Sequence, residues 1–518
     1  MWHIGGARTT IRPMANHYGK SAVKASLVHF FFGKALNAVV SLVTLIALAR
    51  WLTPADYGIY IAFSALQASL LVVSDLGIDT TAERFMPELR MHHSDFELLG
   101  FVAAVLCARV GTLFFMVGIG WLFADDITAI VGLNAYSGLF KLWLGVVAFS
   151  GLLGLAVVLL ESMLHQRPAQ TSMSIYVVLK LLLLYLGWHL FTIDILYMVQ
   201  IELIATCIAA LFGTVQLLSH FSLAGLHDGW LIVKKNRQRL QRFAFFNYFA
   251  QVVFQLFSAE VIKLMVTRLL GVLQSAVYGF AHSLAETVQR YLPTVLLLRL
   301  IKPVFVSRYV KTGDFGQLNS LAQLVLKLNL LILTPTIAFA AVYGGRLLSL
   351  ISNGKYEEAH WLLVGMLGIL VFNSHKIILS LLAGTLEKNK MQLYAGIASS
   401  IVFPIALLLI PRLGPLGAIA VSAISGLTYN TYATFYLRKA GYCYQPDLRA
   451  ATVFLISGIL TFLLIFLINK MLPFLLGLFI AVFIGGSFYI FVVRTMHAFS
   501  KEEVKILNSL LPKTFFNL

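Results

Sequence analysis

The chain has 518 residues, of which 59% are hydrophobic and only 12% are charged, and its mean hydropathy is +0.86. Soluble domains carry about a quarter charged residues, so this composition excludes an ordinary soluble protein and indicates a polytopic membrane protein. The formal net charge of +17 does not require nucleic acid as a partner. Lys and Arg retained on the cytoplasmic side of a membrane, where anionic lipid head groups attract them, explain the charge.

The apolar residues form long runs along the whole chain. A spanning helix needs roughly twenty residues, and about fourteen runs meet that length. They lie near residues 27–48, 58–78, 99–123, 138–160, 172–191, 194–218, 244–267, 274–298, 320–344, 359–383, 391–411, 415–437, 451–469 and 473–493. We therefore predict an all-α polytopic membrane protein with about 14 transmembrane helices. The first run is too long for a signal peptide, so the first helix is expected to stay.

Lys and Arg are distributed unevenly between the two sets of loops that connect these runs. One set, together with both termini, carries 25 of them. The other set carries six, which are Arg50, Arg268, Arg346, Lys355, Arg412 and Lys470. Under the positive-inside rule this bias places both termini in the cytoplasm, and an even number of helices agrees with that orientation.

A short turn between the first two runs recurs later in the chain. Arg50, Leu52, Tyr60 and Leu66 align with Arg268, Leu270, Tyr278 and Leu284, each at the same offset of 268 − 50 = 218. A constant offset over several matches indicates an internal duplication. With six helices per unit, the two copies are parallel repeats, followed by two more helices at the C-terminus. Arg50 and Arg268 are expected to anchor the two turns at the outer interface.

The duplication divides the chain into four predicted parts. They are an N-terminal lobe of helices 1–6 (residues 1–219), a basic cytoplasmic connector (220–243), a C-terminal lobe of helices 7–12 (244–438), and helices 13–14 with a cytoplasmic tail (439–518). The connector combines apolar residues such as Trp230 with a basic run at 234–239, which is typical of an amphipathic segment on the inner leaflet. A solvated loop that obeys the positive-inside rule is an equally good interpretation. Ser500 and Glu503 have capping-box spacing, which predicts a short helix in the tail.

Polar residues recur on one face of four of the predicted helices. They are Lys34, Asn37, Ser41 and Thr44 in the first helix, Tyr60, Ser64, Gln67, Ser74 and Asp75 in the second, Asn247, Gln251, Gln255 and Lys263 in the seventh, with Glu260 nearby, and Tyr278, His282, Glu286 and Arg290 in the eighth. Most spacings are three or four, which places such residues on one side of a helix. Polar groups inside a membrane need partners or water, and these helices are equivalent pairs in the repeat. We therefore predict a shared water-filled cavity between the two halves.

The predicted cavity would bind substrate through nine polar side chains. They are Lys34, Asn37, Gln67, Asn247, Gln251, Gln255, Lys263, His282 and Arg290. The basic groups among them favour an anionic ligand, and phosphate is a natural ligand for Arg and Lys. Four acids are candidates for coupling to H⁺ or Na⁺, or for structural roles, since buried carboxylates can exchange protons near neutral pH. They are Asp56, Asp75, Glu260 and Glu286.

A structural interpretation stays open for each of these residues. Asn, Gln and Ser can bond to neighbouring helices. Glu286 and Arg290 can neutralise each other as an i, i+4 pair, and Lys34 and Lys263 can extend to the lipid interface. Further charged residues fall in predicted helices that have no such stripe, namely Arg109, Lys141, Lys180, Lys327 and Lys376.

No catalytic residue, metal site or cofactor is predicted. The three cysteines form no CxxC pair, which argues against a disulfide framework and a zinc site. Residues 19–21 (Gly-Lys-Ser) end like a Walker A motif, but Met14 stands where the motif requires Gly. The predicted external loops are short, and Asp125-Asp126 is their only candidate metal-binding pair. A transporter is therefore favoured over an enzyme.

Three N-terminal stretches and one later loop have a recognisable pattern. The stretches are residues 42–60, Asp75-Leu76-Gly77-Ile78 and Arg84-Phe85-Met86-Pro87-Glu88, and the loop is residues 303–318 with Gly313-Asp314-Phe315. They resemble the N-terminal signature, and the loop before helix nine, of polysaccharide flippases of the Wzx (O-antigen translocase) type. These flippases belong to the multidrug/oligosaccharidyl-lipid/polysaccharide exporter superfamily, and the resemblance extends over most of the chain.

The resemblance implies two six-helix lobes that form a V, two additional helices, and a cavity lined by helices one, two, seven and eight. It implies alternating access that moves an undecaprenyl-diphosphate-linked oligosaccharide, an O-antigen or capsule/exopolysaccharide repeat unit, between the leaflets of the cell inner membrane. Cationic cavity residues would contact the diphosphate, and Lys34, Lys263 and Arg290 occupy suitable positions. Asp56 follows the family's turn pattern and is expected first to cap the second helix. A glycan polymerase and a chain-length regulator are expected partners.

Two other functions stay open. A cation-coupled multidrug antiporter of the same fold should have an acidic cavity, whereas the cavity predicted here is basic. A membrane glycan polymerase or glycosyltransferase normally needs a substantial external loop with an acidic metal-binding pair.

Overall fold

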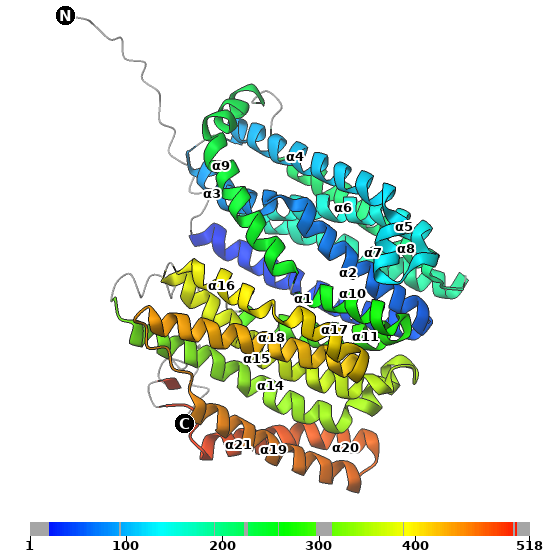
Figure 1. The fold of residues 1–518 in the computed structure, drawn as a ribbon, viewed down its shortest axis with the longest axis vertical. Helices are drawn as coiled ribbons and strands as arrows, with labels where there is room; N and C mark the ends of the chain where they lie inside the picture. Colours follow the sequence, from blue (N-terminus) through cyan, green and yellow to red (C-terminus); the bar gives the residue numbers. More distant parts are fainter. Residues whose placement is uncertain are drawn as a thin grey trace, which may run out of the picture.

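The computed structural model describes residues 20–92, 95–190, 192–221, 226–256, 258–296, 313–386, 388–500 and 503–504. All regular secondary structure in these ranges is helical (Figure 1). Twelve helical segments of the described residues are long and apolar enough to cross a membrane. The predicted class, an all-α polytopic membrane protein, is confirmed, and the count of fourteen stays a prediction. Residues 303–312 of the flippase-like loop, and most of the predicted tail helix, lie outside the described residues.

The first half of the chain forms the upper bundle in Figure 1. Its α-helices are α1 (Lys20–Trp51), α2 (Pro54–Asp75), α3 (Ile78–His92), α4 (Asp95–Leu122), α5 (Ala124–Val131), α6 (Ser137–Ser162), α7 (Gln166–Leu190) and α8 (Ile195–Leu218). α1 packs against α7, and α6 packs against α4, α7 and α8. No helix was predicted at the position of α3. Its charged residues and Pro87 conceal it from a search for long apolar runs.

Apart from α9, which lies beside α3 and α4, the second half lies below the first in Figure 1 and ends in a separate helical layer. Its α-helices are α9 (Leu226–Gln255), α10 (Ala259–Leu270), α11 (Val272–Arg290), α12 (Pro293–Leu296), α14 (Phe315–Ser352), α15 (His360–Thr385), α16 (Asn389–Ser399), α17 (Val402–Leu413), α18 (Pro415–Lys439), α19 (Leu448–Met471), α20 (Phe474–Ile480) and α21 (Gly486–Thr495). α11 and α18 coincide with two predicted spans but are not among the twelve segments above. Both pack against α15, inside the bundle.

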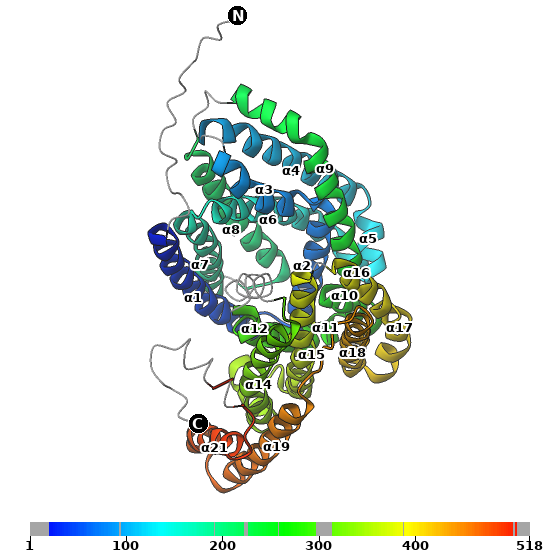
Figure 2. The ribbon, with the colours of Figure 1, turned by 90° about the vertical axis from the view of Figure 1, so that its left-hand side faces the viewer.

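The predicted seventh span consists of two helices. α9 ends at Gln255, and α10 begins after Ser258, whose hydroxyl caps it by accepting from the N–H of Val261. α9 packs chiefly against α4 of the first half, whereas α10 packs against α2 and α11 (Figure 2). The basic residues 234–242 of the predicted connector belong to α9, so this stretch is helical rather than a loop. α9 therefore lies against the first half and connects it to the remaining helices of the second half.

Two glycines mark where α2 meets the second half. An ideal Cβ at Gly58 would lie only 1.9 Å from the carbonyl oxygen of Val272, so the beginning of α2 touches the beginning of α11. At the other end, a Cβ at Gly77 would lie 2.3 Å from the carbonyl oxygen of Ala244 in α9, and Gly77 also has φ of +76°. Only a residue without a side chain permits these approaches. α2 is thus in direct contact with the second half at both of its ends.

The C-terminal layer is attached by a buried cation. Lys327 of α14 lies 2.8 Å from Asp447, which caps α19, and 2.8 Å from Glu503. The predicted capping box is present, because the N–H of Ser500 donates to Glu503 and the N–H of Glu503 donates to the Ser500 hydroxyl. Lys327, an intramembrane charge by sequence, therefore has a structural role. A buried cation needs such partners because desolvation is costly.

Candidate functional site

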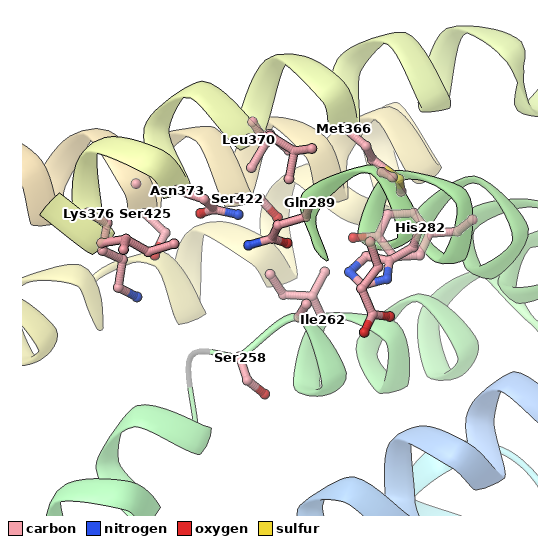
Figure 3. A pocket seen from close by; sticks show the side chains of 17 residues that line it. Ser258, Ile262, His282, Gln289, Met366, Leu370, Asn373, Lys376, Ser422 and Ser425 are labelled. Carbon is pink, nitrogen blue, oxygen red and sulfur yellow. The ribbon is translucent and has the colours of Figure 1, made fainter. Parts of the chain in front are cut away.

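A pocket of about 380 Å³ lies within the second half, between α10, α11, α15 and α18 (Figure 3). Its wall is apolar at Ile262, Met366 and Leu370. Its polar side chains come from the N-cap of α10 and from α11, α15 and α18, and are Ser258, Tyr278, His282, Glu286, Gln289, Asn373, Lys376, Ser422 and Ser425. A concave, largely apolar wall with a few convergent polar groups is the usual composition of a small-molecule site.

α11 supplies one side of the pocket through residues spaced four apart. Tyr278, His282 and Glu286 lie on the same face of this helix, and each of them lines the pocket. The rings of Tyr278 and His282 stack with centroids 6.2 Å apart. Nδ1 of His282 is buried and has no hydrogen-bond partner among the described residues. A ligand in the pocket could satisfy this nitrogen, since buried polar atoms in native proteins are normally bonded.

Two charged side chains line the pocket, Glu286 and Lys376. Glu286 pairs with Arg290 at 2.8 Å, so its charge is compensated. Lys376 has its Nζ 4.8 Å from the centroid of the Tyr429 ring and forms no ion pair with any described residue. The ring offers the ammonium group a cation–π contact but does not neutralise it. An anionic group that enters the pocket would therefore meet one uncompensated cation.

The two remaining charged candidates of α10 neutralise each other. Nζ of Lys263 lies 2.7 Å from Glu260, and the lysine is 8% exposed. Neither residue lines the pocket, although Ile262 between them does. Arg290, one turn beyond Glu286, points outward and is exposed. Of the thirteen residues selected from the sequence, the structure places His282 and Glu286 in this pocket.

The candidates of α1 and α2 face other helices of the first half. The hydroxyl of Ser174 in α7 donates to Asn37 at 2.8 Å, and the amide of Gln67 donates to Ser150 in α6 at 2.9 Å. Lys34 is exposed on α1. These contacts match the interpretation in which polar residues bond to neighbouring helices.

The candidates of α9 are half-buried along its length. Asn247 donates to the carbonyl of Phe243 in its own helix at 2.8 Å, and Gln251 lies one turn further. Gln255 donates to the hydroxyl of Ser69 in α2 at 3.2 Å. Gln255 therefore joins the second half to the first.

Asp56 and Asp75 are both bonded at the ends of α2. Thr53 is the N-cap of α2, and its hydroxyl accepts from the N–H of Asp56 at 3.1 Å and donates to the Asp56 carboxylate at 2.7 Å. The cap residue is thus Thr53, with Asp56 as its partner three positions on. Asp75 accepts from Arg109 at 3.3 Å and from the N–H of Asp79 at 3.0 Å.

A buried polar network in the first half was not predicted from the sequence. Lys180 of α7 forms an ion pair with Glu202 of α8 and lies 2.7 Å from the hydroxyl of Tyr60. The hydroxyls of Tyr60 and Tyr176 donate to the same carboxylate at 3.0 and 2.9 Å. The signal available in the sequence was one lone charge in each of two apolar runs. Such charges indicate a pair only when they are considered together.

The duplicated arginines connect the two halves at the end of the bundle expected to face outward. Arg50 donates to the carbonyls of Leu350 and Ile351, at 2.7 and 2.9 Å, at the end of α14. Arg268 donates to the carbonyl of Ala129 in α5 at 3.1 Å. The expectation that both only anchor their own turns is thus too narrow, because each reaches the opposite half.

Comparison with known proteins finds similarity in structure only. No protein-family model matches the sequence, and no curated protein sequence matches it. The Lipid II flippase MurJ, in an inward closed conformation, has a TM-score of 0.71 and 13% identity over 91% of this chain and 99% of that chain. A multidrug resistance MATE family transporter of the MOP superfamily, inward-facing, has a TM-score of 0.56 and 10% identity over 78% and 95%. The MATE transporter VcmN of Vibrio cholerae has a TM-score of 0.54 and 14% identity over 82% and 99%.

At such identities the likeness establishes the fold alone. The chain therefore shares its fold with the Lipid II flippase MurJ and with MATE transporters.

Proposed function

We propose that this chain is a flippase that moves polyprenyl-diphosphate-linked oligosaccharide across the cell inner membrane by alternating access. The cargo would be an O-antigen or capsule/exopolysaccharide repeat unit, as the Wzx-type resemblance implies. The shared fold with a Lipid II flippase over nearly the whole chain supports a transporter of this kind. No catalytic residue or resident cofactor enters the proposal.

The observation that carries the proposal is the uncompensated Lys376 in the pocket of the second half. A diphosphate is a dianionic or more highly charged group, and Lys binds phosphate as a point charge. His282, Asn373 and Gln289 lie around the same pocket and can hydrogen-bond phosphate or sugar hydroxyls. The polyprenyl tail would stay in the lipid bilayer, so it would not have to enter water during transport.

Transport requires two conformations that both form without cargo. The cargo or a coupling ion then shifts their populations by binding one of them more tightly. The coupling ion would be H⁺ or Na⁺. Asp75, paired with Arg109, and Glu286, paired with Arg290, are the acids that would exchange partners when the ion binds. In the cell, a glycan polymerase and a chain-length regulator would consume the translocated product.

A cation-coupled multidrug antiporter is the second candidate, because two of the structurally similar proteins are MATE transporters. A carrier of cationic drugs needs an acid that is available to the drug. Glu202, Glu260 and Glu286 are each paired with a base in the described structure. The unpaired charge in the pocket is instead a cation, which favours the flippase.

The test is translocation of fluorescently labelled lipid-linked oligosaccharide in proteoliposomes. We expect wild-type protein to flip it and Lys376→Ala to lose at least about tenfold in rate, since loss of one charged hydrogen bond is worth about 1.5–3 kcal/mol. Lys141→Ala is the matched control, because Lys141 contacts Trp121 of α4 and lies outside the pocket. Wild-type protein that expels cationic dye against a proton or sodium gradient, and does not flip the lipid, would favour the antiporter.

A further inference from the structure

A second hollow lies between α3 of the first half and α9 of the second. Its volume is about 660 Å³, and three guanidinium groups line it, those of Arg84, Arg239 and Arg242. Gln238 and Phe246 also line it. None of these residues contributes to the pocket that holds Lys376. This groove is at the end of the bundle predicted to face the cytoplasm.

Two of the three arginines are held in place by one carboxylate and one ring. Glu88 accepts from Arg84 at 2.9 Å and from both terminal nitrogens of Arg239, at 2.6 and 3.1 Å. The guanidinium carbons of these arginines lie 5.5 and 4.9 Å from the centroid of the Phe85 ring. The hydrogen bond from Arg239 and the adjacent positive charges lower the pKa of Glu88, so this acid stays ionised. The arginines are therefore preorganised, which reduces the entropy lost when a ligand binds.

The groove has an excess of positive charge. Three guanidinium groups and one carboxylate leave a balance of two positive charges. Arg242 has no hydrogen-bond or ion-pair partner among the described residues, and the side chains of Arg84 and Arg239 are each 54% exposed. Arg binds phosphate through two parallel hydrogen bonds. The groove is therefore suited to a phosphate group rather than to a neutral or cationic ligand.

An apolar surface adjoins the groove next to Arg242. Phe246 lies one turn after Arg242 on α9 and is 61% exposed, and Phe245 and Phe249 beside it are 58% and 53% exposed. These residues belong to a segment long and apolar enough to span a membrane. A ligand with a charged head and an apolar chain could contact the arginines and the phenylalanines together. This combination favours a lipid over a phosphorylated peptide, which would leave the aromatic rings uncovered.

We propose that the groove between α3 and α9 is a separate binding site for the phosphate head group of a membrane lipid. The head group would lie between Arg242 and the Arg84–Arg239 pair, and the chain would follow Phe246 into the bilayer. Because α3 and α9 belong to different halves, a bound lipid would hold them together. This site does not depend on the proposed cargo, since polyprenyl diphosphate and anionic glycerophospholipids present the same phosphate chemistry.

The experiment measures binding of two fluorescent lipids to the full-length protein in phosphatidylcholine nanodiscs. One is undecaprenyl diphosphate and the other is phosphatidylglycerol. We expect Arg242→Gln to weaken binding about tenfold, and added salt to weaken the wild-type affinity. Arg237→Gln is the matched control, because it removes the same charge from an exposed position on α9 outside the groove.

The outcomes separate the source of the lipid and can overturn the site. A loss confined to undecaprenyl diphosphate identifies a cargo-loading site, and a loss confined to phosphatidylglycerol identifies a lipid that supports the fold or regulates it. Equal binding by Arg242→Gln and Arg237→Gln for both lipids overturns the proposal. Binding of a phosphopeptide with neither lipid bound overturns it as well. Failure of flipping with intact lipid binding would contradict the proposed function and leave this site standing.

If Arg242→Gln fails to fold, Arg84→Gln with Arg239→Gln gives the same test on the other side of the groove. A double variant that keeps the wild-type melting temperature and the wild-type lipid affinity would also overturn the site. A merely structural arginine pair predicts the opposite pattern, with lower thermal stability and unchanged binding of lipid.

Discussion

Arg50 and Arg268 align in the predicted duplication of the sequence, and each donates hydrogen bonds to backbone carbonyls of the opposite half. Arg50 reaches the last turn of α14, and Arg268 reaches the last turn of α5. Helix C-termini carry unsatisfied carbonyls and a partial negative charge, so a guanidinium group is a suitable partner. Lys355 returns the contact by donating to the carbonyls of Arg50 and Leu52, at 2.6 and 2.7 Å. Arg50 and Arg268 thus form two similar contacts between the halves at this end of the molecule.

Removing the hydrogen bonds of both arginines should loosen the interface between the halves at this end. Each exposed bond contributes about 0.5–1.5 kcal/mol, so the Arg50→Ala, Arg268→Ala double variant should open this end several-fold more often. Ala276 is fully buried in α11, and Ala276→Cys in a background without the native cysteines reports opening through its rate of maleimide labelling. Arg412→Ala is the control, since Arg412 has no hydrogen bond or ion pair within the described structure. Unchanged labelling in the double variant would mean that apolar packing alone holds this end closed.

Apolar packing at this end depends on Gly58. A Cβ there would overlap the carbonyl oxygen of Val272, and backbone atoms cannot rotate away as a flexible side chain would. Gly58→Ala should therefore lower the unfolding free energy by about 1–3 kcal/mol, as overpacking does in other cores. The measurement is thermal unfolding in detergent. Gly111→Ala is the matched control because a Cβ at Gly111 meets nothing within 4 Å, and an equal melting temperature for both variants would contradict the close contact.

Variants of the buried Lys180–Glu202 pair can show whether the pair has a structural role or takes part in ion coupling. Removing one partner leaves a buried charge, so Lys180→Met or Glu202→Gln alone should cost about 3–5 kcal/mol of stability. The Lys180→Met, Glu202→Gln double variant should recover most of this loss, because the Gln oxygen can accept from one of the Tyr60 and Tyr176 hydroxyls and its amide can donate to the other. Thermal unfolding of the three variants tests the structural role of the ion pair. Lipid flipping by the double variant tests a role in ion coupling, since a coupling role predicts a stable protein that no longer transports.

Asp79, in the first turn of α3, should make the free energy of unfolding depend on pH. Burial, followed by the negative charge of Asp75, raises the pKa of Asp79 to about 7, and Arg109 offsets part of the effect while Glu83 adds to it. An unfolded Asp has a pKa of about 3.9, so the folded protein binds the proton more tightly. The unfolding free energy should therefore fall as pH rises from about 4 to 7 and then level off.

Asp79→Asn removes the titrating carboxyl group, so the unfolding free energy of this variant should depend less on pH. The check is the melting temperature between about pH 5 and pH 8, where the wild type should lose more than the variant. Asp126→Asn, at an exposed position in α5, should keep the wild-type profile. If the melting temperature of Asp79→Asn falls with pH as steeply as that of the wild type, the pH dependence comes from another group.

The stripe in α11 was predictable because helical spacing alone places Tyr278, His282 and Glu286 on one face. The opposite wall was not, since Asn373, Lys376, Ser422 and Ser425 form no extended stripe in apolar helices. Their meeting with α11 depends on how α15 and α18 pack, and no local pattern encodes that packing. The expected stripes of α1 and α2 were real as patterns. In the structure, Asn37 and Gln67 bond to neighbouring helices, which spacing cannot distinguish from facing a cavity.

The same limit applies to helix boundaries. The membrane class followed from composition, because long apolar runs have few alternatives. The break between α9 and α10 did not, since Ser258 is an ordinary polar residue until its hydroxyl is seen to cap α10. α3 was missed because it is too polar to resemble a span, although its Arg84, Phe85 and Glu88 form one side of the groove with α9.

His282 is the pocket residue whose removal should affect transport without affecting stability. Its Nδ1 has no hydrogen-bond partner in the described residues, so substitution loses no intramolecular bond. His282→Phe keeps an aromatic ring against Tyr278, and the melting temperature should stay near that of the wild type. Flipping should nevertheless fall about tenfold, because the ligand loses a buried hydrogen-bonding group. Ser283→Ala, one position further on α11 and outside the pocket, is the control. Normal transport by a stable His282→Phe variant would remove His282 from the binding site and leave Lys376 as its main polar anchor.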